Sequence, residues 1–265
     1  MSIRCYRSAF RLLFVVLLVL TVSSVAYNAY RRASEVSLDL SANTISEVSR
    51  KIVQRTVAIF DTARGNLEVD ALVVGDRDIV AHRDELLKIF WKQVQLTPQL
   101  LSGFVADARG SFVQARELPQ LVTRVIDRGA DPPQERILYR DRNYRPIAHI
   151  KGGALYEPTS RPWYLGTSDD GKVRWSSVYR FTSIEKLGVT ASKAVLDSAG
   201  RIRAVVGADI ALEGLSEFLA EQRIAKGGVG MIVDSSDRLV AFPYQLKLKP
   251  RADGSAYEGT PRVSD

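Results

Sequence analysis

The sequence predicts an α+β protein in which a membrane-anchored helical part precedes a domain built on an antiparallel sheet. Three observations predict this class. The first is an uncharged apolar run over residues 12–30, and the second is a seven-residue hydrophobic repeat over residues 33–67. The third is a series of short β-type runs separated by aspartate-centred turns. Helices followed by hairpins, in this order, are typical of α+β domains.

The apolar run over residues 12–30 is long enough to cross a bilayer as one helix. Three arginines precede it, which favours a cytoplasmic location for residues 1–11, although Arg31 and Arg32 follow it and weaken the asymmetry. The alternative is a cleaved signal peptide, with Ser24-Val25-Ala26 as its small-x-small site. The apolar run continues past that site, which favours a single-pass anchor in the inner membrane. With either reading, the main domain is periplasmic or otherwise extracytoplasmic.

The basic excess of the chain belongs to this anchor. The net charge is +7, and residues 1–32 hold five arginines and no acid. Removing these five from the 37 basic residues leaves 32 against 30 acidic ones, so no basic stripe remains that could follow a phosphate backbone. We therefore expect no nucleic-acid partner. The only cysteine, Cys5, lies on the cytoplasmic side of the anchor, which excludes a disulfide in the main domain.

Residues 31–67 form a predicted stalk helix that ends near Gly65-Asn66. Its stripe recurs every seven residues, at Leu38, Ile45, Ile52 and Ile59. Such a stripe is buried on its own domain, on a second copy of the chain, or on both in succession. A homodimer through the stalk is one of these expectations.

A second helix is predicted from Asp76 to about Leu96, closed by Pro98. Short β-type runs then flank four aspartate-centred turns, at residues 107–110, 141–143, 197–200 and 234–237. Aspartate and glycine favour the backbone geometry of tight turns. The runs on either side of each turn are therefore expected to pair as hairpins of one antiparallel sheet.

This order of elements, with Arg161-Pro162-Trp163-Tyr164 and the apolar run over residues 205–210, resembles the double Cache sensor domain. That family carries two PAS-like modules on a long N-terminal helix, outside the membrane, in chemoreceptors, sensor kinases and nucleotide cyclases. The resemblance covers roughly residues 33–242. It implies a membrane-distal module at 68–212, a connecting helix at 213–226 and an incomplete proximal module at 227–265. No output domain is expected in this chain, which would be a fragment or a truncated form. Receptors fused to class III nucleotide cyclases are one type that the resemblance implies.

The resemblance also implies a ligand pocket. Its expected residues are Tyr156, Arg161, Trp163, Tyr164, Tyr179, Phe181 and Asp209. The first four have the spacing Tyr-x4-Arg-x-Trp-Tyr of the amino-acid-binding version of the family. A guanidinium group forms two parallel hydrogen bonds with a carboxylate. The aromatic side chains supply an apolar wall, and their hydroxyl and N–H groups can form hydrogen bonds. Phe181 stands where that version has an acid that helps to hold an ammonium group. The sequence therefore favours a small carboxylate ligand over an α-amino acid.

Structural roles compete with these assignments. Trp163 and Tyr164 could be plain core aromatics, and Asp209 could be a turn or helix-start residue at the end of an apolar strand. Arg161 could pair with an internal acid such as Glu157 or Asp169. A periplasmic solute-binding or scavenging protein and an amino-acid-sensing receptor are the alternative functions.

Catalysis and metal binding find no support in the sequence. His82 and His149 are the only histidines and lack nearby ligand spacing. Ser160 and Ser192 belong to no nucleophile elbow, and no glycine-rich phosphate loop follows a strand. We therefore expect no cofactor and no enzymatic activity.

Overall fold

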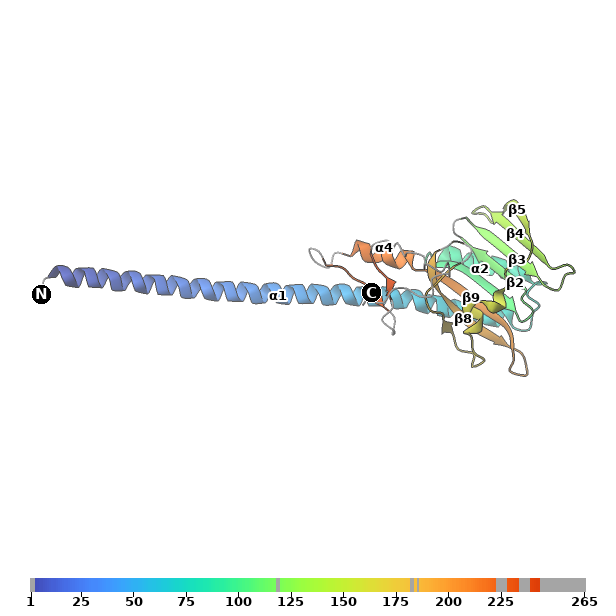
Figure 1. The fold of residues 1–265 in the computed structure, drawn as a ribbon, viewed down its shortest axis with the longest axis horizontal. Coiled ribbons are helices and arrows are strands. Elements are labelled where there is room, and N and C mark those ends of the chain that lie inside the picture. The colour runs from blue at the N-terminus through green and yellow to red at the C-terminus, as the bar shows by residue number, and fades with distance from the viewer. Residues whose placement is uncertain are drawn as a thin grey trace, which may run out of the picture. The chain divides into compact units, whose positions relative to one another are not determined.

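The computed structural model describes residues 3–117, 120–181, 184, 186–222, 228–233 and 239–243 (Figure 1). Its helices are α1 (Ile3–Val74), α2 (Arg83–Leu96), the 3-10 helix η1 (Pro158–Ser160), α3 (Pro162–Leu165) and α4 (Glu213–Glu221). Its strands are β1 (Leu100–Asp107), β2 (Phe112–Arg116), β3 (Val122–Asp127), β4 (Gln134–Arg140), β5 (Pro146–Gly152), β6 (Arg174–Trp175), β7 (Tyr179–Arg180), β8 (Leu187–Leu196), β9 (Ile202–Ala211), β10 (Ile232–Val233) and β11 (Leu239–Ala241). The predicted α+β class is confirmed.

A 9-stranded antiparallel sheet forms the centre of the domain. Its strands follow the order β5-β4-β3-β2-β1-β9-β8-β6, and β7 also pairs with β8 (Figure 1). Strand β1, the first in the sequence, thus lies in the sheet between its sequence neighbour β2 and the distant strand β9. Ser102 of β1 lies opposite Asp209 of β9. This pairing brings residues from opposite ends of the domain onto adjacent positions.

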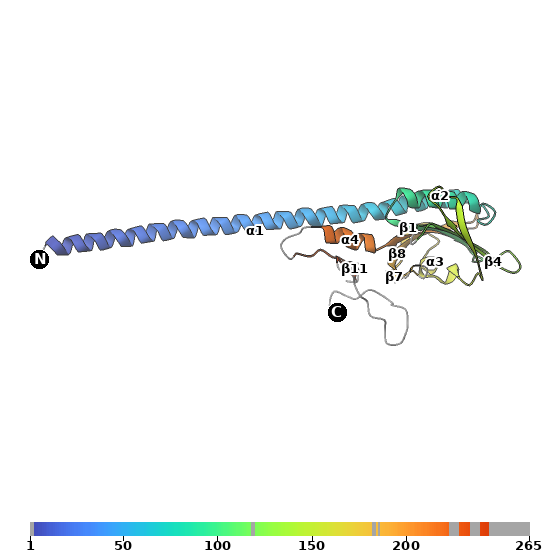
Figure 2. The ribbon, with the colours of Figure 1, turned by 90° about the horizontal axis from the view of Figure 1, so that it is seen from above.

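The two faces of the sheet are covered differently. Helix α2 lies over one face and α3 lies over the other (Figure 2). On the helical face Leu86, Leu87 and Phe90 are fully buried, and Phe90 approaches so closely that a Cβ on Gly103 would lie 3.2 Å from it. Full burial of each such side chain contributes about 1.5–3 kcal/mol. On the other face the residues from 153 to 181, which we call the covering segment, cross over Phe104 and Phe112.

Helix α1 extends beyond its predicted end. The prediction that it stops at Gly65-Asn66 was wrong, because the helix continues to Val74 with Leu67, Asp70 and Val74 buried. It ends at Gly75, whose φ of +40° is costly for other residues and whose N–H bonds to Ala71 O at 3.0 Å. Tertiary burial thus outweighs the weak helix propensity of one glycine.

The predicted hydrophobic stripe divides along the helix. Ile52 and Ile59 are buried in the core, whereas Leu38 and Ile45 are exposed in the single chain. The first of the three predicted alternatives, packing within one chain, therefore applies to the C-terminal part of the stripe.

Among the described residues, α1 also contains one segment long and apolar enough to cross a membrane, by length and composition alone. A signal sequence would meet the same criterion.

Helix α2 begins later than predicted. Residues 76–82 form turns instead of helix, because the Asp78 carboxylate accepts hydrogen bonds from the N–H groups of Val80 and Ala81, each at 2.9 Å. Short polar side chains compete in this way with helical hydrogen bonding. Ile79, which was expected on the helix face, is nevertheless buried. The predicted end of α2 before Pro98 is confirmed.

Three of the predicted turns share one hydrogen-bonding pattern. In each, the aspartate Oδ1 accepts from the backbone N–H groups two and four residues later. Asp107, Asp141 and Asp197 do so at distances between 2.8 and 2.9 Å. A turn held by its own side chain is fixed locally, and for this reason it can be recognised from sequence. The fourth turn, at residues 234–237, lies outside the described residues.

Arg203 of β9 ties the sheet to the end of α1. Its guanidinium donates to the carbonyl oxygens of Gly75, Asp76 and Arg77. These carbonyl groups follow directly on the C-terminus of α1, where the partial negative charge of the helix end favours a cation. This contact, which we call the Arg203 clamp, joins elements that lie far apart in the sequence.

The division into two modules stays a prediction. Helix α4 occupies most of the predicted connecting helix, with Leu215 and Leu219 buried. Strands β10 and β11 pair as the hairpin expected at the opening of a second module. Residues 223–227, where the boundary was placed, and those after residue 243 lie outside the described parts.

Stability is expected to fall as the pH rises from about 4 to 7, because of Asp70 on α1. This carboxyl is 2% exposed, and burial raises its pKa to about 7, with only the Gln93 hydrogen bond at 2.7 Å opposing the shift. Between the unfolded and folded pKa values the folded state binds more protons, so deprotonation weakens it, by a few kcal/mol at most. Thermal melting at pH 4.5 and pH 8 measures the effect.

The matched substitution is Asp70→Asn, with Asp169→Asn at an exposed position as the control. Asparagine keeps the shape and cannot ionise, so Asp70→Asn should be more stable than the unmodified chain at pH 8 and similar to it at pH 4.5. An equal pH dependence in both chains would contradict the assignment of the effect to Asp70.

Candidate ligand-binding site

A cavity of about 540 Å³ lies between the sheet and the covering segment. Its volume falls in the usual range for small-molecule sites, about 300–1,000 Å³. The residues that line it are Phe104, Phe112, Gln114, Arg124, Leu155, Tyr156, Glu157, Ser160, Arg161, Trp163, Tyr179, Phe181 and Asp209. Six of the seven predicted site residues are among them, so the structure brings together positions spread over residues 156–209.

The covering segment is held in place by its own capping and by one arginine. Glu157 accepts hydrogen bonds from the N–H and hydroxyl groups of Thr159, which starts the 3-10 helix η1. Arg128, which directly follows β3, donates a hydrogen bond to Tyr156 O at 3.0 Å and forms an ion pair with Glu157 at 3.3 Å. Glu157, one of the acids considered as an internal partner of Arg161, is therefore already paired.

Aromatic rings form the floor of the cavity. Trp163 is 2% exposed and meets Phe104 edge-on, with ring centroids 4.7 Å apart, and Tyr156 lies 5.2 Å from Phe112. Trp163 therefore has both of the roles that the sequence left open, since it is a core residue that also lines the cavity. Tyr164 packs on Trp163, with ring centroids 5.6 Å apart, and is not among the residues that line the cavity. Its role in ligand binding stays a prediction.

Asp209 lies at the centre of a buried hydrogen-bond network. Its Oδ2 accepts from Ser102 Oγ at 2.7 Å, and its Oδ1 accepts from Thr190 Oγ1 at 2.6 Å. Gln114 donates in turn to Ser102. Tyr179 lies 2.6 Å from Thr190 Oγ1, and because the Thr190 proton is used on Asp209, the Tyr179 hydroxyl must be the donor there.

The position of Asp209 corrects the alternative reading of this residue. Asp209 lies inside β9, opposite Thr190 on one side and Ser102 on the other, and does not start a helix. Its side chain therefore faces the cavity as part of the sheet. Burial raises its pKa to about 6, while the hydrogen bonds from Thr190 and Ser102, and the charges of Arg116 and Arg161, lower it. The group is mostly ionised at pH 7.

Two tyrosines supply neutral donors to the cavity. Burial raises the pKa of Tyr179, and the nearby Asp209 charge raises it further. Burial also raises the pKa of Tyr156, against the hydrogen bond from Trp163. Both phenols therefore keep their protons at neutral pH. The Tyr179 proton is used on Thr190, so Tyr156 is the phenol that can donate to an anion.

The cationic side of the cavity contains one predicted residue and one that the prediction missed. Arg161 is partly buried and lines the cavity, and its charge reaches both Asp209 and Tyr156. Arg124 of β3 lines it as well, with its guanidinium 4.6 Å from the centre of the Tyr156 ring and bonded to Glu135 at 2.6 Å. The inward-facing positions of Gln114 and Arg124, on otherwise buried strands, were a signal of polar contact that the sequence offered.

Phe181 closes the opposite corner of the cavity. The ring is 4% exposed and stands perpendicular to Tyr179, with centroids 5.1 Å apart. It fills the space above Gly188, where a Cβ would lie 2.1 Å from the ring. A phenyl ring with a glycine beneath it makes this corner apolar and tightly packed.

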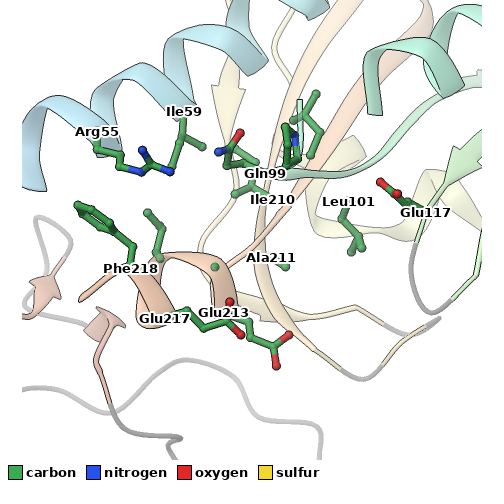
Figure 3. Close-up of a pocket in the computed structure, with 14 residues that line it drawn as sticks. Arg55, Ile59, Gln99, Leu101, Glu117, Ile210, Ala211, Glu213, Glu217 and Phe218 are labelled. Atoms are coloured by element: carbon green, nitrogen blue, oxygen red, sulfur yellow. The ribbon is translucent and has the colours of Figure 1, made fainter. Parts of the chain in front are cut away.

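A second cavity, of about 510 Å³, lies between α1, α4 and the start of β1 (Figure 3). Ile59, Leu101 and Phe218 give it an apolar wall, and the Arg55 guanidinium lies 5.1 Å from the centre of the Phe218 ring. Three glutamates, Glu117, Glu213 and Glu217, also line this cavity. Their charge disfavours an anion, so the first cavity is the candidate for a carboxylate. The described residues contain no group of acids, cysteines and histidines that could hold a metal ion.

Comparison with known proteins confirms the resemblance to Cache sensor domains. Residues 129–217, which include all seven predicted site residues, match the family model of the methyl-accepting chemotaxis protein-like, first PDC sensor domain. The ligand-binding domain of the Campylobacter jejuni chemoreceptor Tlp3, in complex with L-norvaline, shares the fold with a TM-score of 0.53 at 14% identity. That match covers 82% of this chain and 73% of the Tlp3 chain. The protein therefore has the Cache/PDC sensor fold of chemoreceptors.

Two curated proteins are related in sequence. Methyl-accepting chemotaxis protein McpC of Bacillus subtilis is 34% identical over 89 residues, which make up 33% of this chain and 13% of that protein. Adenylate cyclase 1 of Rhizobium meliloti is 21% identical over 250 residues, or 88% of this chain and 37% of that protein. The chain thus spans well under two thirds of the length of either relative.

Proposed function

We propose that this chain is the extracytoplasmic small-molecule-sensing part of a membrane-anchored signal-transduction receptor. We further propose that its ligand is a small solute with a carboxylate group. One observation carries the proposal: a cavity of small-molecule size is lined by Arg161 from the covering segment and by Asp209 from the sheet.

The chemistry of the cavity favours a carboxylate. Two guanidinium groups, of Arg124 and Arg161, line it, and that of Arg124 is paired with Glu135. Guanidinium forks bind carboxylates with two parallel hydrogen bonds. The protonated hydroxyl of Tyr156 can donate to the same ligand. The L-norvaline of the Tlp3 domain is itself a small carboxylate, which supports the proposal.

The apolar segment of α1 is proposed as the membrane anchor, with the sensor domain outside the cytoplasm. The exposed residues Leu38 and Ile45 are proposed to contact a second copy of the chain. Retention of the full chain in the membrane pellet after alkaline carbonate washing is the expected result. A soluble form that begins near Tyr27 would show that the segment is a cleaved signal peptide.

The output lies outside this proposal. One curated relative is named a chemotaxis protein and the other an adenylate cyclase, so their names describe different outputs. A segment that resembles parts of two proteins with different outputs can have a role that both outputs need, which is the sensing of a ligand. We therefore assign a binding function to the described cavity and no catalytic step.

A thermal-shift screen of the detergent-solubilised full chain tests the ligand class. Small carboxylates should raise the melting temperature, and amines of equal size without a carboxylate should not, because Arg161 and Arg124 repel a cation. Equal stabilisation by the amines would contradict the proposal. A preference for α-amino acids over other carboxylates would show that the site belongs to the amino-acid-binding version of the family.

A further inference from the structure

We propose that the ligand is a 2-hydroxycarboxylate, bound with its carboxylate toward Arg161 and with its hydroxyl donating to Asp209. This inference rests on the proposed function and deepens it, because it names the second group that the site recognises. Three kinds of ligand group could meet the acceptor sites that Asp209 offers to the cavity: an ammonium, a hydroxyl and a plain hydrocarbon.

Asp209 can accept one more donor on each oxygen. A carboxylate oxygen has two lone-pair sites, and Ser102 uses one on Oδ2 while Thr190 uses one on Oδ1. Both hydroxyl donors are fixed in direction, since Gln114 donates to Ser102 and Tyr179 donates to Thr190. The side chain lines the cavity and is only 8% exposed, so water has little access to the remaining lone pairs.

An ammonium group fits this corner poorly. The Asp209 charge is already stabilised by the charges of Arg116 and Arg161, so an ammonium would add a third cation to one carboxylate. Glu157, the other acid that lines the cavity, is paired with Arg128. The remaining wall at this corner is the apolar ring of Phe181, packed against Gly188. An ammonium has three protons to satisfy, and this corner offers it one shared acid.

A hydroxyl group fits better than either alternative. The hydroxyl brings one proton for Asp209 and adds no positive charge at this corner, where Arg116 and Arg161 already act on Asp209. A hydrocarbon at the same place would cover the free lone pairs of a buried carboxylate without a hydrogen bond. Sites built to bind a hydroxyl group strongly reject the analogue that lacks it. Loss of one hydrogen bond to a charged acceptor corresponds to about tenfold to a hundredfold in affinity.

The test uses matched ligands that differ in one group at C2. Titration calorimetry on the full chain in detergent compares lactate, alanine and propionate, and then 2-hydroxy-3-methylbutanoate, valine and 3-methylbutanoate, with both enantiomers of each chiral compound. In the series that fits the cavity, one hydroxy acid should bind at least about tenfold tighter than its amino and unsubstituted partners. Tighter binding of the amino acid, or equal binding of the unsubstituted acid, would overturn the inference and leave the carboxylate assignment intact. If no carboxylate binds, the proposed function itself fails.

Two variants give the readout that a merely structural role of Asp209 would not produce. In Asp209→Asn, the preference for the hydroxy acid over the unsubstituted acid should fall toward one, whereas it should be unchanged in the exposed control Asp169→Asn. In Phe181→Asp, the preference should move toward the amino acid, because the corner gains an acid. Melting curves establish that each variant is folded. An unchanged preference in both folded variants would also overturn the inference.

Discussion

Replacing Arg161 with alanine is expected to lower the affinity for any carboxylate ligand by about tenfold to a hundredfold. A partly enclosed guanidinium–carboxylate contact contributes roughly 1.5–3 kcal/mol, and each 1.4 kcal/mol corresponds to about a factor of ten. Arg161 lines the cavity and is partly buried, so solvent screens the contact less than at an open surface. Calorimetric titration of Arg161→Ala with the tightest carboxylate measures the loss.

Two further variants complete this experiment. Arg161→Lys keeps the charge and removes the planar fork, so an intermediate affinity is expected. Arg136→Ala removes an exposed guanidinium from β4 and should leave the affinity unchanged. An Arg161→Ala chain that binds carboxylates as tightly as the unmodified protein would contradict the assignment of Arg161 as the carboxylate-binding residue.

The largest expected loss of stability follows the substitution Phe104→Ala, at about 3–5 kcal/mol. Phe104 is 2% exposed, and its ring contacts Phe112 at 5.6 Å and Trp163 at 4.7 Å. It also fills the space over Gly207, where a Cβ would lie 2.3 Å from the ring. Removing the ring leaves a cavity beneath the ligand site, and denaturant unfolding measures the cost.

The control for Phe104→Ala is Leu155→Ala. Leu155 also lines the cavity, but its side chain is 92% exposed, so a change within about 0.5 kcal/mol is expected. Because Trp163 rests on Phe104, the Phe104→Ala chain should also bind ligand more weakly. Equal stabilities of the two variants would show that the floor of the cavity does not depend on Phe104.

Local features of the fold could be predicted from the sequence. The turns at Asp107, Asp141 and Asp197 each depend on one side chain and the next four residues, so their signal lies within a short window. The end of α1 could not be found in this way. Gly65 lies where a Cβ would touch nothing, and the helix passes through it because buried residues beyond it hold the helix to the core. That contribution is tertiary, and a local stop signal does not report it.

The candidate site also has a part that local sequence predicts and a part that only tertiary contacts determine. Tyr156, Arg161 and Trp163 were recognised because a spacing within one segment links them. The residues that determine the state of Asp209 were missed, because Ser102 is separated from it by 107 residues and meets it only through the pairing of β1 with β9. Arg124 and Gln114 reach the cavity from β3 and β2, and no motif connects them with Asp209. Tyr164 shares that spacing but is not among the lining residues, because spacing alone does not show which ring faces a cavity.

The Arg203 clamp links strand β9 to the end of α1 as well as to the candidate site. The same strand carries Asp209, which lines the cavity, and, six positions earlier, the guanidinium that donates to the carbonyl groups of Gly75 and Asp76, directly after α1. A strand is stiff along its length, because its hydrogen bonds to β1 and β8 fix its register. Under the proposed function, a small displacement of β9 on ligand binding would therefore reach the segment that follows α1 through Arg203, and occupancy of the cavity would be transmitted to the end of the helix.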